Sequence, residues 1–306
     1  MITARRMLGA LATVASLTLI AGCVSVDPLG ARDSTGGDGP IVVGSQDYYS
    51  NEIVAEIYAQ ALESAGHEVR REFRIGQREA YLPEIEAGSI DLFPEYTGPV
   101  LQTWEPETAA RTADDVYAAL LDAAPAGVRV LDQSAASDQD SFVVTRAFAE
   151  EYGVSSIADL AAVPTTLTLG GGSEGENRPS GPAGIKQMYD VDVSFAPIED
   201  GGGPLTVKAL LEDQVQLAVI YTASPSMSTA ELVALDDPAG LLLASHIVPL
   251  ASDRLDEDAV AVVDRISNAM TAADLVALNT RSVQEEASAA TVAAGWLAEH
   301  IEVLGG

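Results

Sequence analysis

The stretch IDLFPEYTG, residues 90–98, joins a short apolar run to a proline, a carboxylate and an aromatic ring. Residues 90–93 have the composition of a buried strand, and Pro94 is expected to end it, because proline donates no hydrogen bond to a sheet. Tyr96 then follows a completed strand. In α/β sheets, ligands bind beyond the carboxyl ends of the strands. The stretch therefore favours an α/β fold in which Tyr96 belongs to a binding site rather than to the core.

Strands and helices alternate on both sides of this stretch. We predict a strand at 41–45, a helix at 51–65, a strand at 69–75 and a helix that ends at Gly88, so the chain opens β-α-β-α-β. The pattern repeats after residue 140, with buried strands and short helices in turn, and this alternation is typical of α/β proteins. Two α/β units are predicted, and the chain is expected to cross between them at 131–140 and 241–247.

The amino-acid composition limits the classes of function that the chain could have. The chain has 306 residues, of which 47% are hydrophobic, and this is long enough for two modest domains with real cores. Its formal net charge is −30, which disfavours nucleic-acid binding. Such a charge suits solubility at an exposed surface. A single cysteine excludes a disulfide framework within the chain.

The N-terminal segment predicts export. Arg5 and Arg6 precede an apolar run at 8–20 that is too short to span a bilayer comfortably. The run ends in LIAGC, residues 19–23, which resembles the lipobox of bacterial lipoproteins, where the cysteine becomes lipidated. Cys23 is the only cysteine of the chain, which makes the signal specific. An ordinary signal peptide with a chance cysteine is the alternative.

This interpretation divides the N-terminal region into two parts. Residues 1–22 are expected to be a lipoprotein signal peptide. Residues 23–40 are rich in Gly, Asp and Ser, so they are expected to be a flexible tether that starts at the lipidated Cys23. The predicted location is the extracytoplasmic face of the cell membrane, with the lipid as anchor.

Two enzyme motifs occur but lack their context. GGGSEG, residues 170–175, matches both the dinucleotide-binding pattern G-x-G-x-x-G and the nucleophile pattern G-x-S-x-G. Each pattern needs a helix to begin at once, whereas Pro179 and Pro182 predict a continuing loop. An exported serine hydrolase that uses Ser173 therefore stays only as an alternative. No histidines or carboxylates have metal-ligand spacing, so neither a metal nor a cofactor is predicted.

Tyrosines follow several of the predicted strands. Tyr48 and Tyr49 come after the first strand, Tyr96 after the third and Tyr221 after the strand at 215–220. The carboxyl ends of strands in one sheet gather at one edge. Aromatic faces collected there would attract a quaternary ammonium ion through cation–π interaction.

Several longer blocks resemble one family. Residues 44–69, 75–98, 176–189 and 209–225, in this order, are similar to segments of the solute-binding proteins of osmoprotectant ABC importers. The most specific part is 76–98, which ends in PEYTG. That family binds glycine betaine, choline, carnitine and related compounds. The resemblance extends from about residue 41 to about residue 300.

The resemblance implies a fold and a role. The fold is α/β, two-lobed and of the type II periplasmic-binding-protein kind, with a mostly parallel sheet flanked by helices in each lobe and the ligand in the cleft between the lobes. Lobe 1 would comprise residues 41–140 and 245–306, and lobe 2 residues 141–244. The role implied is that of a binding subunit that catalyses no reaction. It would hand its solute to an ABC permease driven by a cytoplasmic ATPase.

The resemblance also implies site residues. Tyr96 and Tyr221 match the tyrosines of the family's ammonium cage, and Arg178 matches its carboxylate-binding arginine. One of four aromatic residues is expected to supplement the cage: Tyr48, Tyr49, Tyr81 or Phe142. Thr97 and Gly98 are expected to present backbone groups to the ligand.

Other positions depart from the family pattern. Gln46 replaces a frequent lysine, Pro99 replaces a frequent threonine, and Asp140 stands where a cage aromatic is usual. The position of a further cage aromatic falls near Ser245 or His246, neither of which offers a good π face. Two carboxylate-binding groups are lost and an acid is gained, which predicts a cationic ligand that lacks a carboxylate, such as choline.

Arg178 leaves alternatives open, because it would lie uncomfortably close to a pure cation. It is expected either to pair with Asp140 or Glu95, or to hold the carboxylate of a betaine.

Overall fold

The structure is a computed structural model, and it describes residues 39–228, 231–300 and 305. The predicted signal peptide at 1–22, the predicted lipidation site Cys23 and nearly all of the predicted tether at 23–40 lie outside these residues. Within the described ranges, no helix is long and apolar enough to cross a membrane.

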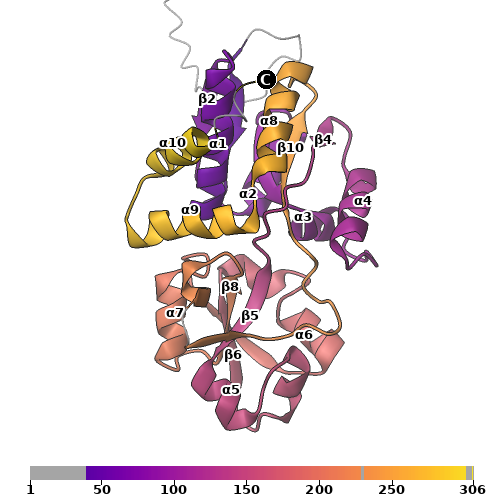
Figure 1. The fold of residues 1–306 in the computed structure, drawn as a ribbon. Coiled ribbons are helices and arrows are strands. Elements are labelled where there is room, and N and C mark those ends of the chain that lie inside the picture. The colour runs from indigo at the N-terminus through magenta and orange to yellow at the C-terminus, as the bar shows by residue number, and fades with distance from the viewer. Residues whose placement is uncertain (1–38, 229–230, 301–304, 306) are drawn as a thin grey trace, which may run out of the picture. The chain divides into compact units, whose positions relative to one another are not determined.

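The first sheet contains five strands that come from both ends of the described chain (Figure 1). Strand β1 pairs in parallel with β2 and β3, while β10 runs antiparallel to its neighbours β3 and β4. One strand therefore opposes the other four. The order across the sheet is β2 (Val69–Glu72), β1 (Ile41–Gly44), β3 (Leu92–Tyr96), β10 (Ile247–Ser252) and β4 (Val128–Val130).

Helix α1 (Tyr49–Ser64) forms the centre of the core beside this sheet. Its apolar residues recur at helical spacing, and Ile53, Ile57 and Leu62 are fully buried. Helix α1 contacts α8, α9 and α10, as Figure 1 shows. The helices of this part are α2 (Arg78–Glu86), α3 (Thr97–Trp104), α4 (Ala113–Ala123), α8 (Glu257–Ala269), α9 (Ala272–Gln284) and α10 (Ala289–Glu299).

The second sheet repeats the arrangement of the first. Strand β6 pairs in parallel with β7 and β8, and β5 runs antiparallel to β8 and β9. The order is β7 (Val193–Pro197), β6 (Leu167–Gly171), β8 (Leu217–Tyr221), β5 (Asp140–Thr145) and β9 (Leu232–Ala234). Its helices are α5 (Arg146–Tyr152), α6 (Pro182–Tyr189) and α7 (Pro204–Leu211), with 3-10 helices η1 (Ile157–Ala162), η2 (Ser173–Asn177) and η3 (Pro225–Ser228). The predicted α/β fold class is confirmed.

The prediction that Pro94 ends its strand is wrong, because Pro94 lies inside β3 (Leu92–Tyr96). It stands opposite Pro249 in the antiparallel pair with β10. The carbonyl of Pro249 accepts from the N–H of Leu131 (3.0 Å), and that of Pro94 accepts from Nδ2 of Asn51 (2.7 Å). Both carbonyls thus turn away from the shared pair. The two prolines occupy a position without ladder hydrogen bonds, where a missing N–H costs nothing.

The chain crosses from the first sheet to the second at 131–139 and returns at 235–246. These crossing segments touch each other: Ser137 and His246 form an isolated antiparallel bridge. The hydroxyl of Ser137 also donates to the carbonyl of Ser245 at 2.7 Å. The crossing at 131–139 carries Asp138, so it places a carboxylate where the chain passes between the two sheets.

Candidate functional site

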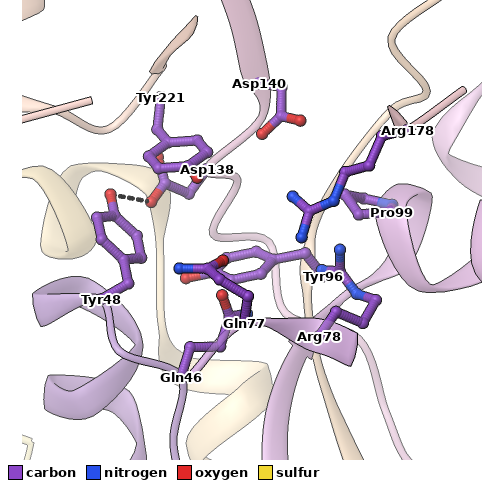
Figure 2. Close-up of a pocket in the computed structure, with 10 residues that line it drawn as sticks. All are labelled: Gln46, Tyr48, Gln77, Arg78, Tyr96, Pro99, Asp138, Asp140, Arg178 and Tyr221. Carbon is purple, nitrogen blue, oxygen red and sulfur yellow. Dashed lines mark hydrogen bonds between the residues drawn. The ribbon is translucent and has the colours of Figure 1, made fainter. Parts of the chain in front are cut away.

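A small pocket, with a cavity of about 20 Å³ that is partly open to solvent, lies where β3 and β8 end (Figure 2). Its walls come from both sheets, from the start of α2 and from the crossing at 131–139. Six residues predicted from the sequence line it: Gln46, Tyr48, Tyr96, Asp140, Arg178 and Tyr221. Four other residues complete the lining: Gln77, Arg78, Pro99 and Asp138.

Two predicted residues, Thr97 and His246, are not among those lining the pocket. Instead they brace each other. The N–H of Thr97 donates to the carbonyl of His246 at 2.9 Å, and the N–H of His246 donates to the hydroxyl of Thr97 at 3.0 Å. The ring Nδ1 of His246 lies 3.0 Å from the carbonyl of Ser134. Helix α3 begins at Thr97, and the side chain of this residue ties the helix to the crossing segment.

Three tyrosines form the aromatic part of the pocket. The ring centroids of Tyr48 and Tyr221 are 4.8 Å apart, with 51° between the ring planes. Tyr96 has two roles, because it lines the pocket and also belongs to the apolar cluster that contains Leu92. Burial raises the pKa of all three hydroxyls, so the rings stay neutral and keep their π faces.

Asp138 is the pocket residue that the sequence analysis missed most clearly. Its carboxylate accepts from the hydroxyl of Tyr48 at 3.0 Å and from the N–H of Ala223 at 2.9 Å (Figure 2 draws the first bond). The residue is only 4% exposed. Burial raises the pKa of this carboxyl from 3.8 to about 6, against the lowering effect of its two donors. A nearly buried carboxylate thus lies directly against the tyrosines.

Asp140 begins β5, and in the sheet it stands opposite Tyr221 of β8. Burial raises the pKa of its carboxyl, while the charges of Arg178 and Arg78 act in the opposite direction. Among the residues that the structure describes, its carboxylate has neither a hydrogen-bond partner nor an ion-pair partner within 4 Å. The acid that replaces an expected aromatic ring therefore faces the pocket without a direct partner.

The two arginines of the pocket have carboxylate partners that the sequence did not reveal. Arg78 forms a buried, two-point pair with Glu95: Nε lies 2.6 Å from Oε1, and Nη2 lies 3.0 Å from Oε2. Arg178 lies 3.3 Å from Glu79 and 3.6 Å from Glu174. The ion pairs of Arg178 are therefore with these two glutamates, rather than with Asp140 or Glu95.

A polar group of the pocket is left without a protein partner. The side-chain Nε2 of Gln46 is buried and has no hydrogen-bond partner among the described residues. The backbone of Gln46 is fixed, because its N–H donates to Oδ1 of Asn51 at 2.9 Å. A buried donor without an acceptor costs free energy, so an oxygen atom of a ligand would satisfy it.

The hydrolase alternative gains no support. The predicted loop after β6 is in fact the 3-10 helix η2, which begins at Ser173. The N–H of Ser173 donates to Glu199 at 3.1 Å. Two histidines are engaged elsewhere: His246 contacts Ser134, and the ring of His300 stacks on Trp296. In the described part of the chain, no hydrogen bond joins a histidine to Ser173.

Two α/β units joined by two crossings, with a polar and aromatic pocket at strand ends, define a ligand-binding protein of the solute-capturing class. Residues 39–299 match the family described as the substrate binding domain of ABC-type glycine betaine transport systems. The match covers most of the chain, and the chain belongs to this family. The resemblance predicted from the sequence is confirmed. The family consists of solute-binding proteins rather than enzymes.

Solved structures share the fold. A glycine betaine/carnitine/choline ABC transporter protein superposes with a TM-score of 0.68 at 18% identity, over 86% of this chain and 99% of that one. The lactococcal protein OpuAC, closed on glycine betaine, gives 0.62 at 16% identity, over 88% of this chain and 98% of that one. An ABC-transporter choline binding protein in complex with choline gives 0.62 at 13% identity, over 87% and 91%. At these identities the likeness supports the fold alone.

Proposed function

We propose that this chain captures a quaternary ammonium solute in the pocket and delivers it to an ABC permease, whose ATPase drives uptake. The observation that carries the proposal is the meeting of Tyr48, Tyr96 and Tyr221 with the buried carboxylate of Asp138 in one pocket. Ring faces attract a cation, and a carboxylate behind them strengthens the attraction in a site of low dielectric.

The proposed action is closure of two lobes, residues 41–140 with 245–306 and residues 141–244, over the solute. The crossings at 131–139 and 235–246 would be the hinge, because they are the segments through which the chain passes between the sheets. Closure would exclude water and so strengthen the contacts to the cation.

In the proposal, a membrane anchor keeps the domain near its permease. In the proposal, residues 1–22 are the export signal and Cys23 is lipidated. The domain is then held at the extracytoplasmic face of the membrane, where solute and permease are both accessible.

The test is a calorimetric titration of the purified protein with choline, glycine betaine and carnitine. At least one of them is expected to bind. Tyr221→Leu removes the ring and should weaken that binding about tenfold or more. Tyr221→Phe keeps the ring and is the matched control, which should bind nearly as well as the wild type. Absence of binding to all three compounds, or equal losses in the two variants, contradicts the proposal.

A further inference from the structure

Arg78 is not available to bind an anion. Its side chain is 8% exposed and makes a two-point pair with Glu95, whose own side chain is fully buried. Glu95 also accepts from the hydroxyl of Tyr81 at 2.7 Å. Such a two-point pair fixes the guanidinium in direction as well as in charge. Arg78 therefore enters the pocket wall as a neutralised group.

Arg178 is engaged in a looser way. It lies between Glu79, on α2, and Glu174, on η2, at 3.3 Å and 3.6 Å. Two carboxylates thus accompany one guanidinium. These neighbours partly balance the positive charge that would attract a ligand carboxylate, although Glu79 is 60% exposed and solvent screens its pair.

The carboxylates of Asp138 and Asp140, by contrast, are not paired with a basic side chain among the described residues. Asp138 is bonded to two neutral donors, the hydroxyl of Tyr48 and the N–H of Ala223. Asp140 lines the pocket with no direct partner among the described residues. The raised pKa of each carboxyl has burial as its main cause, and the charge of a neighbouring cation would reverse this shift. The two aspartates lack a direct basic partner, although the charges of Arg178 and Arg78 lower the pKa of the Asp140 carboxyl, and a cationic ligand would supply such a partner.

We propose that the pocket selects quaternary ammonium cations without a carboxylate, of the choline type, and that Asp138 and Asp140 are the selecting groups. The inference rests on the proposed function and narrows its ligand class. A ligand carboxylate would bring a further negative charge beside two carboxylates that lack a positive partner, which is unfavourable in a site of low dielectric. A hydroxyl would instead accept from the unpaired Nε2 of Gln46 and donate to a carboxylate.

The test compares choline, glycine betaine and tetramethylammonium as ligands of the purified full-length chain by calorimetry. Choline is expected to bind at least about tenfold more tightly than glycine betaine. Tetramethylammonium should bind between them or close to choline, because it carries the charge without the hydroxyl. This comparison needs no variant, so a folding defect cannot obscure it.

Variants assign the effect to Asp140. Asp140→Asn should weaken choline binding several-fold and reduce the preference over glycine betaine. Asp122→Asn is the matched control, since it makes the same change on exposed surface of α4 and should leave both affinities unchanged.

The outcomes separate the two proposals. Glycine betaine binding as tightly as choline, or an unchanged preference in Asp140→Asn, overturns this inference while the proposed function stands. Failure of all three ammonium compounds, and of carnitine, overturns both.

Discussion

The pocket has two charged ends that differ in how their charges are met. At one end Arg78 and Glu95 hold each other in a buried pair, with Tyr81 as a further donor. At the other end Asp138 and Asp140 have no basic group within 4 Å among the described residues, and Tyr48 and Tyr221 stand beside them (Figure 2). Removing one partner of a buried pair destabilises the fold, whereas a carboxylate without a basic partner in a pocket is a candidate for ligand binding. The comparison separates structural from functional acids within one pocket.

The largest effect is expected from breaking the buried ion pair between Arg78 and Glu95. Glu95→Gln keeps the shape of the side chain but leaves the guanidinium of Arg78 buried without a counter-charge. Removing one partner of a buried pair typically lowers the free energy of unfolding by about 3–5 kcal/mol. Urea denaturation of the variant and the wild type measures the difference.

The matched control is Glu257→Gln. Glu257 pairs with Arg129 at 3.4 Å, but its side chain is 90% exposed, so solvent screens the pair and little change is expected. If the two substitutions cost the same, the Arg78–Glu95 pair is not the structural element described.

A smaller effect, on ligand affinity, is expected from a change of pH that titrates the Asp138 carboxyl. The pKa of the Asp138 carboxyl is raised by burial to about 6, so it is mostly ionised at pH 7.5 and mostly protonated at pH 5. Protonation removes the charge that faces the cation. Choline affinity should therefore fall by up to about tenfold between these values, and binding near pH 6 should release protons. Asp138→Asn should flatten the profile, and a flat wild-type profile contradicts the assignment.

Without ligand, the contribution of Asp138 to folding stability changes with pH in the opposite direction to the affinity for choline. The folded carboxyl of Asp138 holds its proton to a higher pH than its ordinary value of 3.8. Between that value and about 6 the unfolded chain binds fewer protons, so the contribution of this group to stability falls as pH rises. The neighbouring charges of Asp140, Arg78 and Arg178 act on the same pocket, so the slope is best read as the difference between the wild type and Asp138→Asn.

Features that follow from local pattern were predictable from the sequence. Alternating apolar runs gave the α/β class, and Tyr96 and Tyr221 were recognised because each ends a strand. Asp138 was missed because it lies in a crossing segment that has no periodicity. Arg78 was missed because its partner Glu95 is brought to it by a helix and the following strand.

The direction in which a side chain points was harder to predict than the place of its residue near the pocket. Thr97 follows Tyr96 directly, yet α3 starts there and turns the hydroxyl toward the crossing segment. Gly98 shows how close that segment comes, since a Cβ there would lie 2.8 Å from the carbonyl oxygen of Ala244. No sequence pattern announces such an approach. The prediction for Pro94 failed for a related reason. The strand accommodates Pro94 because Pro249, from a strand far along the chain, stands opposite it.

A crystal structure of the protein with choline tests the central claim most directly. The account predicts the ammonium nitrogen within about 6 Å of the ring centroids of Tyr48 and Tyr221, with the hydroxyl bonded to Asp140 and Arg178 still paired with its glutamates. A choline bound outside this pocket, or an ammonium group directed away from both tyrosines and both aspartates, would contradict it.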